Sequence, residues 1–261
     1  MSNKILCEIS HPLSMKFPKN VPIAERNSID VCLSLLFRPE YESLRDSIAP
    51  DEKDKIQLAK TLFQAILVTD IATPKNVQLA IRRYEACEEA SNLPAADLSP
   101  LTHYIFDLLD GIGLDEDAKV RHLDEFVFTR EELQICTANE HFMMLSDIAH
   151  LLQGWKNFVK WNFRLYKEIH ACFKKGLCDN PREGWYQGQI DFTDKYVIPL
   201  SKRSKRFLQG GFSDRLLRNG LTNRNIWIQQ GKLATEIISN AVDTDENEVN
   251  VMQRLIELCA G

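Results

Sequence analysis

The sequence lacks several features that would assign a protein to a class at once. Its seven cysteines contain no C-x-x-C pair, so neither a zinc-finger pattern nor a disulfide framework is indicated. No apolar run reaches the ~18 residues that a membrane span needs, and the N-terminus has no apolar stretch of the kind that directs secretion. A net charge of −5 argues against the basic field typical of nucleic-acid binding. We therefore expect a cytoplasmic protein with reduced thiols, no membrane segment and no nucleic-acid partner.

The patterns that are present are those of helices. Apolar residues recur at steps of three and four, and we find neither the alternation typical of strands nor an internal repeat. Pro50-Asp51-Glu52 is a helix start, and Lys174-Lys175-Gly176 is a helix end. The sequence therefore predicts an all-α fold, with one compact domain over residues 1–242 and an acidic C-terminal tail over residues 243–261.

Residues 143–200 hold the most informative pattern. Small or apolar residues recur there on one helix face: Met144, Leu151, Gly154, Phe158, Trp161, Leu165 and Cys172. Asp147 falls on the same face, and a carboxylate buried without a partner costs roughly 3–5 kcal/mol. Asp147 therefore either caps or pairs locally, as most buried acids do, or binds a metal ion.

A second acid continues another apolar face. The helix that starts at Pro50 carries Ile56, Ala59, Phe63 and Ile66, and the next step along that face is Asp70. Two long helices that each place one acid inward are more suggestive of a functional site than either alone.

Three further groups have a bland and a functional interpretation. Residues 110–117 faintly resemble a calcium loop, but they lack its alternating acids, so a solvated loop is favoured. Gln189, Phe192 and Tyr196 share a helix face. A basic group forms a solvated face or, as the less favoured alternative, a patch for phosphate or an anionic partner: Arg203, Lys205, Arg206, Arg215 and Arg218.

Taken in order, short motifs resemble those of the class I 3',5'-cyclic nucleotide phosphodiesterase catalytic domain. Ser2-Asn3-Lys4-Ile5 resembles the end of the family signature H-D-x-x-H-x-G-x-x-N-x-apolar, and Pro22 to Ser28, around Glu25, resembles x-x-x-E-x-H-H. Val68-Thr69-Asp70-Ile71 resembles A-T-D-M, and Leu145 to His150 resembles the A-D segment that holds a metal-binding aspartate. Gly188 to Asp194 resembles Q-x-G-F-x-D. Each motif is short, and their order and spacing over some two hundred residues carry the resemblance.

The resemblance implies a compact multi-helix phosphohydrolase domain, similar to the HD superfamily, that depends on zinc together with magnesium or manganese. Such a domain hydrolyses cyclic AMP, cyclic GMP or both to nucleoside 5'-monophosphates. It implies that Asp147 is a metal ligand. It also implies that Asp70 and Glu25 do not bind the metal directly but act on the groups that do, for example by hydrogen bonds to metal-bound water or a ligating histidine. It also implies that Gln189 addresses the purine edge while Phe192 stacks on its face.

The sequence also departs from the family pattern. The resemblance places the proton-donating histidine, two ligating histidines and the first ligating aspartate before Met1, and none of the six histidines stands at a matching position. Asn27-Ser28 replaces a histidine pair, Met144 and Pro74 stand where histidine is frequent, and Asp191 replaces a glycine. We therefore expect the chain to be the C-terminal part of such a domain, with no catalytic general acid of its own.

Three alternatives stay open at this point. Asp147 and His150, three residues apart, can form a makeshift metal site with two ligands. The chain can also be a catalytically inactive helical module that binds purine nucleotide or a protein partner. The third alternative is an all-α scaffold without a nucleotide site.

Overall fold

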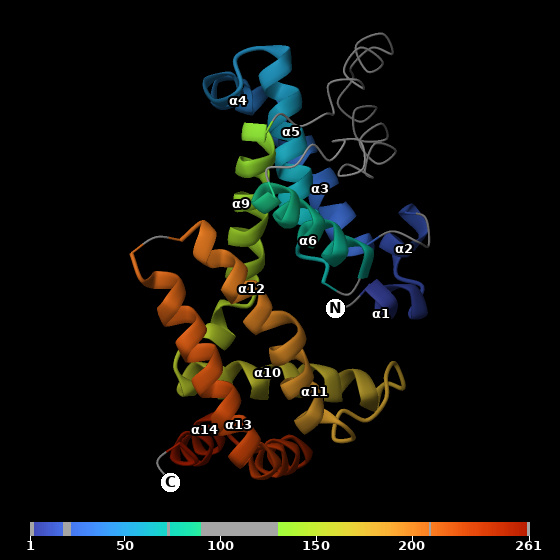
Figure 1. Ribbon diagram of the computed structural model, residues 1–261. Coiled ribbons are helices and arrows are strands. Elements are labelled where there is room, and N and C mark those ends of the chain that lie inside the picture. Colours follow the sequence, from blue (N-terminus) through green and yellow to red (C-terminus); the bar gives the residue numbers. More distant parts are fainter. Residues whose placement is uncertain (1–2, 18–21, 72–73, 90–129, 209, 260–261) are drawn as a thin grey trace. The chain divides into compact units, whose positions relative to one another are not determined.

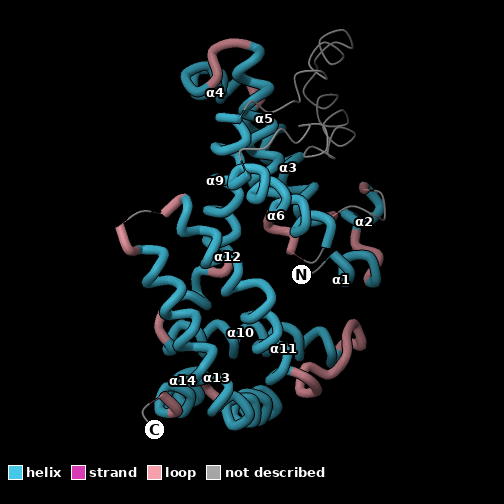
Figure 2. Tube along the Cα trace, viewed as in Figure 1, coloured by secondary structure: helices cyan, strands magenta, loops and turns pink. Residues whose placement is uncertain are grey.

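The computed structural model describes residues 3–17, 22–71, 74–89, 130–208 and 210–259. Every regular element in these ranges is a helix, which confirms the predicted all-α class (Figures 1 and 2). The chain divides into two compact units, Met1–Met143 and Met144–Gly261, where the sequence suggested a single domain. Residues 110–117, for which the sequence favours a solvated loop over a calcium loop, lie outside the described residues. None of the helices in the described ranges is long and apolar enough to cross a membrane.

Among the residues that the structure describes, the first unit contains seven complete elements and most of an eighth. They are α1 (Asn3–Glu8), α2 (Pro12–Lys16), α3 (Ile23–Leu36), η1 (Pro39–Tyr41), α4 (Glu42–Ile48), α5 (Glu52–Leu67), α6 (Pro74–Glu89) and α9 (Arg130–Asp147), whose last four residues belong to the second unit. The helix predicted to start at Pro50 is α5, and the Asp51 carboxylate accepts the Asp54 N–H at 2.8 Å as its N-cap.

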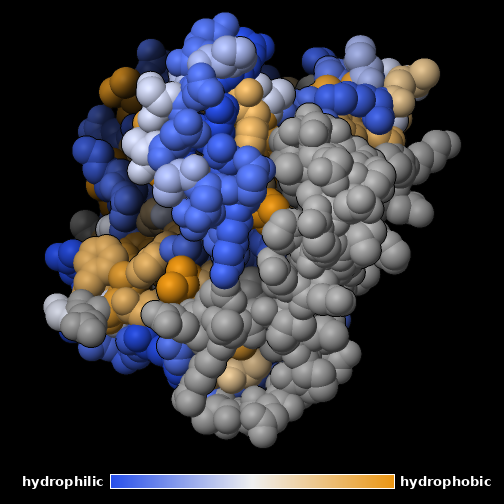
Figure 3. Space-filling model, turned by 90° about the horizontal axis from the view of Figure 1, so that it is seen from above, coloured by the Kyte–Doolittle hydropathy of each residue, from blue (hydrophilic) through white to orange (hydrophobic). Residues whose placement is uncertain are grey.

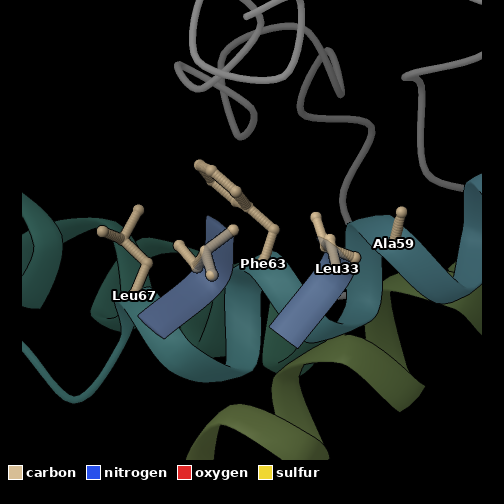
Figure 4. Packing of buried hydrophobic residues seen from close by; sticks show 5 residues of the cluster. Leu33, Ala59, Phe63 and Leu67 are labelled. Atoms are coloured by element: carbon tan, nitrogen blue, oxygen red, sulfur yellow. The ribbon is translucent and has the colours of Figure 1, made fainter. Parts of the chain in front are cut away.

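The core of the first unit lies between α3 and α5. Ile29 and Leu33 on α3 pack against three α5 residues at steps of four, Ala59, Phe63 and Leu67 (Figure 4). Ala59 and Phe63 are on the face that the apolar spacing predicted, whereas the predicted Ile66 is only partly buried and Leu67 takes the next core position. Asp70 lies three residues beyond Leu67, after the helix has ended, and its side chain is only 3% exposed.

The second unit is built around a long helix, α13. Its elements are η4 (Ala149–Leu152), α10 (Trp155–Lys174), α11 (Trp185–Phe192), η5 (Thr193–Val197), α12 (Ile198–Arg203), η6 (Ser204–Arg206), α13 (Phe212–Asp243) and α14 (Glu248–Glu257). Trp155 on α10 stacks on Phe158 with ring centroids 5.3 Å apart and lies 6.5 Å from the Trp227 ring on α13. An aromatic core therefore joins α10 to α13.

The single long helix expected around Asp147 is wrong. Helix α9 ends at Asp147, the chain turns through η4, and α10 starts in a new register after Gly154, whose backbone is extended. The buried face of α10 consequently runs through Trp155, Phe158, Val159, Asn162, Phe163, Tyr166 and His170. Trp161 and Leu165, expected inside, are 46% exposed, and Asp147 itself is exposed.

The break is stabilised by asparagines on α13. The Asn223 amide donates to the carbonyls of Leu151 at 3.0 Å and Gln153 at 2.7 Å, and the Asn219 amide donates to the Leu152 carbonyl at 3.0 Å. These carbonyls would otherwise be left without helical partners where the chain leaves the helix. The break thus depends on residues about seventy positions further along the chain.

The expected acidic tail at residues 243–261 is also wrong over most of its length. Asn247 caps α14 by accepting the Val249 N–H at 2.8 Å, and Val251 and Leu255 are fully buried. The Leu255 carbonyl accepts the Trp155 indole N–H at 2.8 Å. An amphipathic helix that packs on α10 and α13 therefore takes the place of a solvated tail.

Hydrophilic residues predominate on the face seen in Figure 3, with smaller groups of hydrophobic residues among them. This distribution agrees with a composition in which 26% of residues are charged.

The packing of Trp227 generates a prediction about a glycine inside α13. A Cβ at Gly231 would lie 2.8 Å from the Trp227 ring, whereas a Cβ at Gly188 in α11 would meet nothing within 4 Å. We expect Gly231→Ala to lower the free energy of unfolding by about 1–3 kcal/mol, because the core is already filled. Gly188→Ala, the matched control, should raise it by up to ~1 kcal/mol through helix propensity. Urea unfolding followed by tryptophan fluorescence measures both, and stabilisation by Gly231→Ala would contradict this packing.

Candidate functional site

Asp147 occupies the C-terminal end of α9, and the turn that follows brings His150 next to it. His150 makes a hydrogen bond to the Asp147 backbone, and burial lowers the pKa of the imidazole while the Asp147 carboxylate opposes that shift. The side chain of Asp147 reaches solvent, yet the surrounding protein raises its pKa, with His150 acting in the opposite direction. An accessible carboxylate beside an imidazole is a pair of groups suited to holding a divalent cation.

This pair does not by itself complete the expected metal site. A zinc site takes three or four protein ligands, and no group of three or more histidine, cysteine, aspartate or glutamate side chains in the described part of the chain is arranged to hold a metal ion. The donor set around Asp147 therefore fits one weakly held cation better than a tightly held metal pair.

Tyr196 lies on the helix that runs through α11, η5, α12 and η6, and the Asp147 charge acts on it. Its side chain is only 8% exposed, and its hydroxyl has no hydrogen-bond partner among the residues that the structure describes. Burial raises the pKa of Tyr196 to about 12, the Asp147 charge adds to this rise, and the Arg203 charge opposes it. An aspartate, a tyrosine and an arginine thus act on one another in this region.

Phe192 and Gln189 lie on the same helix as Tyr196. The Phe192 ring stacks on Tyr196 with centroids 5.3 Å apart and planes at 18°, which confirms that these two share a face. Both Gln189 and Phe192 are half-buried, and the Gln189 amide makes no hydrogen bond to another described residue. One helix therefore offers a ring with a fixed orientation and an amide about one turn away.

The helix reaches this arrangement through one wide turn. Residues Thr193–Val197 form a π-helical turn just before Pro199, which has no N–H to donate to the carbonyl four residues earlier. Asp194 in this turn is held by a bidentate ion pair with Arg224 of α13, whose hydrogen bonds lower the pKa of Asp194. The wide turn and the ion pair fix the orientation, relative to α13, of the helix face that carries Phe192 and Tyr196.

Asp191, which replaces the glycine of the family motif, lies along the outside of the helix. Its carboxylate accepts the Gln187 amide N–H at 2.7 Å and pairs with the Lys195 ammonium at 2.7 Å. Hydrogen bonds from both groups lower the pKa of Asp191. Asp191 therefore contacts Gln187, four residues earlier, and Lys195, four residues later, rather than Gln189 or Phe192.

Glu25 lies in the first unit, in the first turn of α3. It accepts the Asn3 amide N–H at 2.9 Å, while the Asn3 side-chain oxygen accepts the Ala24 backbone N–H at 2.8 Å. Asn3 thereby ties α1 to the start of α3. Asp70 belongs to the same unit.

Sequence reasoning missed a buried polar layer in the first unit. Arg83 of α6 and Glu140 of α9 form an ion pair with two contacts, at 2.9 and 2.6 Å, and both side chains are buried. Burial raises the pKa of Glu140, and Arg83 opposes the rise. Gln64 of α5 joins this layer because its side-chain oxygen accepts a hydrogen bond from the Cys136 thiol of α9, with 2.7 Å between oxygen and sulfur. The only available signal was that these α9 residues share a helix face.

The unpartnered hydroxyl of Tyr196 leads to a stability prediction. A buried polar group without a partner costs about 1–3 kcal/mol, so Tyr196→Phe should raise the free energy of unfolding or leave it unchanged. Tyr166→Phe is the matched control: Tyr166 is also buried, but its hydroxyl hydrogen-bonds to Ser239, so its loss should destabilise by about 1 kcal/mol. Denaturant unfolding compares the two, and equal destabilisation would show that Tyr196 has a partner.

Comparison with known proteins now gives these residues a context. The family model described as 3'5'-cyclic nucleotide phosphodiesterase matches residues 1–214, a range that includes Glu25, Asp70, Asp147, Gln189 and Phe192. No curated protein and no solved structure matches the chain. The match covers well over half of the chain and agrees with the helical fold. The chain belongs to the 3',5'-cyclic nucleotide phosphodiesterase family, whose members are metal-dependent, all-helical enzymes that hydrolyse cyclic nucleotides.

Proposed function

We propose that this chain binds the purine of cyclic AMP, cyclic GMP or both through Gln189 and Phe192, and that Asp147 is a metal ligand in their hydrolysis to nucleoside 5'-monophosphates. The observation that carries the proposal is the single helix face on which Phe192 stacks against Tyr196, a side chain on which the Asp147 charge also acts. A purine held on Phe192 would therefore lie on the helix face that carries this tyrosine.

Each residue has a chemical reason for its role. The Gln189 amide has one acceptor and two donors and is not engaged by other described residues, so it is available to a purine edge. The Phe192 ring is backed by Tyr196, which holds its orientation and leaves it half-exposed for stacking. A purine can therefore be recognised by its edge and its face together.

The described residues around Asp147 supply fewer metal ligands than a two-metal site needs. Asp147 offers a hard carboxylate oxygen, as magnesium or manganese prefers, and His150 offers a nitrogen that also suits zinc. Zinc with magnesium or manganese is our proposed pair, and two donors are too few to hold both ions. Asp70, buried beyond α5, and Glu25, fixed by Asn3, are proposed to support the metal site through hydrogen bonds to metal-bound water or to a ligating histidine.

A second candidate function follows from the same donor count. The chain can bind purine nucleotide without hydrolysing it, because binding would need only Gln189 and Phe192, whereas the donors around Asp147 number two. For either function we propose a cytoplasmic location, which is supported by seven free cysteines.

Nucleotide binding is tested with paired glutamine substitutions. We expect Gln189→Ala and Phe192→Ala each to weaken cyclic AMP or cyclic GMP binding about tenfold or more, because each removes a purine contact worth roughly 1–3 kcal/mol. Gln187→Ala, on the same helix but bonded to Asp191, should leave affinity unchanged. Isothermal titration calorimetry measures all three, and equal losses for Gln187 and Gln189 would refute the assignment.

Hydrolysis is tested separately through Asp147. With zinc plus magnesium or manganese added, we expect Asp147→Asn to lower turnover at least a hundredfold while nucleotide affinity changes little. Asp191→Asn, an equal loss of charge on the outer side of the nucleotide-binding helix, should retain turnover. Product nucleoside 5'-monophosphate is quantified by chromatography. Binding without turnover in the unmodified chain would favour the second candidate function, and turnover that survives Asp147→Asn would exclude Asp147 as a ligand.

A further inference from the structure

The basic residues around the turn between α12 and α13 stand apart from the rest of the chain. Residues 202–218 contain six basic side chains and one acidic side chain, a net charge of +5, whereas the whole chain carries −5. Five of the basic side chains are exposed: Lys202, Lys205, Arg206, Arg215 and Arg218. The proposed nucleotide and metal sites use none of them.

An ion pair, a ring contact and a charge effect link three of these cations to the first turn of α13. Lys205 of η6 forms an ion pair with Asp214 in the first turn of α13, and Arg218, one turn later, also lowers the pKa of Asp214. The Arg215 guanidinium lies over the Phe212 ring, 5.1 Å from its centroid, and Phe212 is 43% exposed. We call this surface, formed by the five exposed cations and Phe212, the basic face.

The basic face lies at one end of a long helix. Helix α13 has 32 residues and is therefore about 48 Å long, and α14 follows its opposite end (Figure 1). The positive end of the α13 dipole adds to the charge of the cations. A flat, negatively charged surface can reach this end of α13 without meeting α14.

We propose that the basic face docks the protein on an anionic lipid surface. Clusters of four to eight basic residues on an amphipathic helix attract acidic headgroups, and an exposed aromatic ring beside them can enter the headgroup region. The cations are distributed over exposed positions of α12, η6 and α13 beside an exposed aromatic ring, an arrangement that suits an extended layer of anions with an apolar interior.

Vesicle co-sedimentation with the full chain tests the proposal. We expect the partition coefficient on vesicles of phosphatidylcholine with 30% phosphatidylserine to exceed that on pure phosphatidylcholine at least tenfold at 0.1 M salt. At 0.5 M salt the difference should fall to twofold or less, because the attraction is screened. Equal partitioning on the two vesicles, or binding that resists salt, would overturn the proposal.

Variants locate the contact. Arg215→Glu/Arg218→Glu should reduce partitioning at least tenfold, whereas Lys156→Glu/Lys174→Glu, an equal charge reversal at exposed positions of α10, should change it less than threefold. Phe212→Ser should reduce partitioning threefold or more, and Val249→Ser, at a 72% exposed position on α14, should not. Equal losses in variant and control, or no loss for Phe212→Ser, would overturn the assignment of this face. Tighter binding to a single-stranded oligonucleotide or to polyglutamate than to the anionic vesicles, at equal charge concentration, would also overturn it.

Discussion

The second unit depends on a few hydrogen bonds that α13 donates to the chain between α9 and α10. Asn219 and Asn223 satisfy three successive carbonyls, at Leu151, Leu152 and Gln153, where the helical ladder is interrupted. Without these donors, water or a continuous helix would have to satisfy this backbone. The interruption places Asp147 at a helix end, where its carboxylate reaches solvent and His150 turns back toward it. A structural asparagine pair thus determines how the candidate metal ligand is presented.

The candidate nucleotide-binding residues depend on the same long helix in another way. The Arg224–Asp194 ion pair holds the wide turn of η5 against α13, and the turn sets Tyr196 beneath Phe192. Tyr196 also has a buried hydroxyl whose pKa the Asp147 charge raises, so the aromatic face and the acidic group are coupled electrostatically through one side chain. Both asparagines and the arginine are on α13. A movement of that helix would therefore displace both the turn that carries Asp147 and the turn that carries Tyr196.

The sequence predicted those features that arise from local spacing. The start of α5 near Pro50-Asp51-Glu52, the inward position of Ala59 and Phe63, and the shared face of Phe192 and Tyr196 all follow from residues close together in the sequence. The break after Asp147 could not be predicted, because its partners are on α13, and a periodicity rule assumes an unbroken helix. The Arg83–Glu140 pair joins residues 57 positions apart, and the burial of Leu255 requires Trp155. These contacts join residues far apart in the sequence, so no local pattern predicts them.

The contact between Trp155 and Leu255 has a consequence for how the family and the fold are related. The family match ends at residue 214, within the first turn of α13. Asn223, Trp227 and Leu255, which complete the core around Trp155, all lie beyond it. The segment that carries the family resemblance therefore shares its core with residues that the family match does not cover. The end of the match and the end of the packed core fall at different places in the chain.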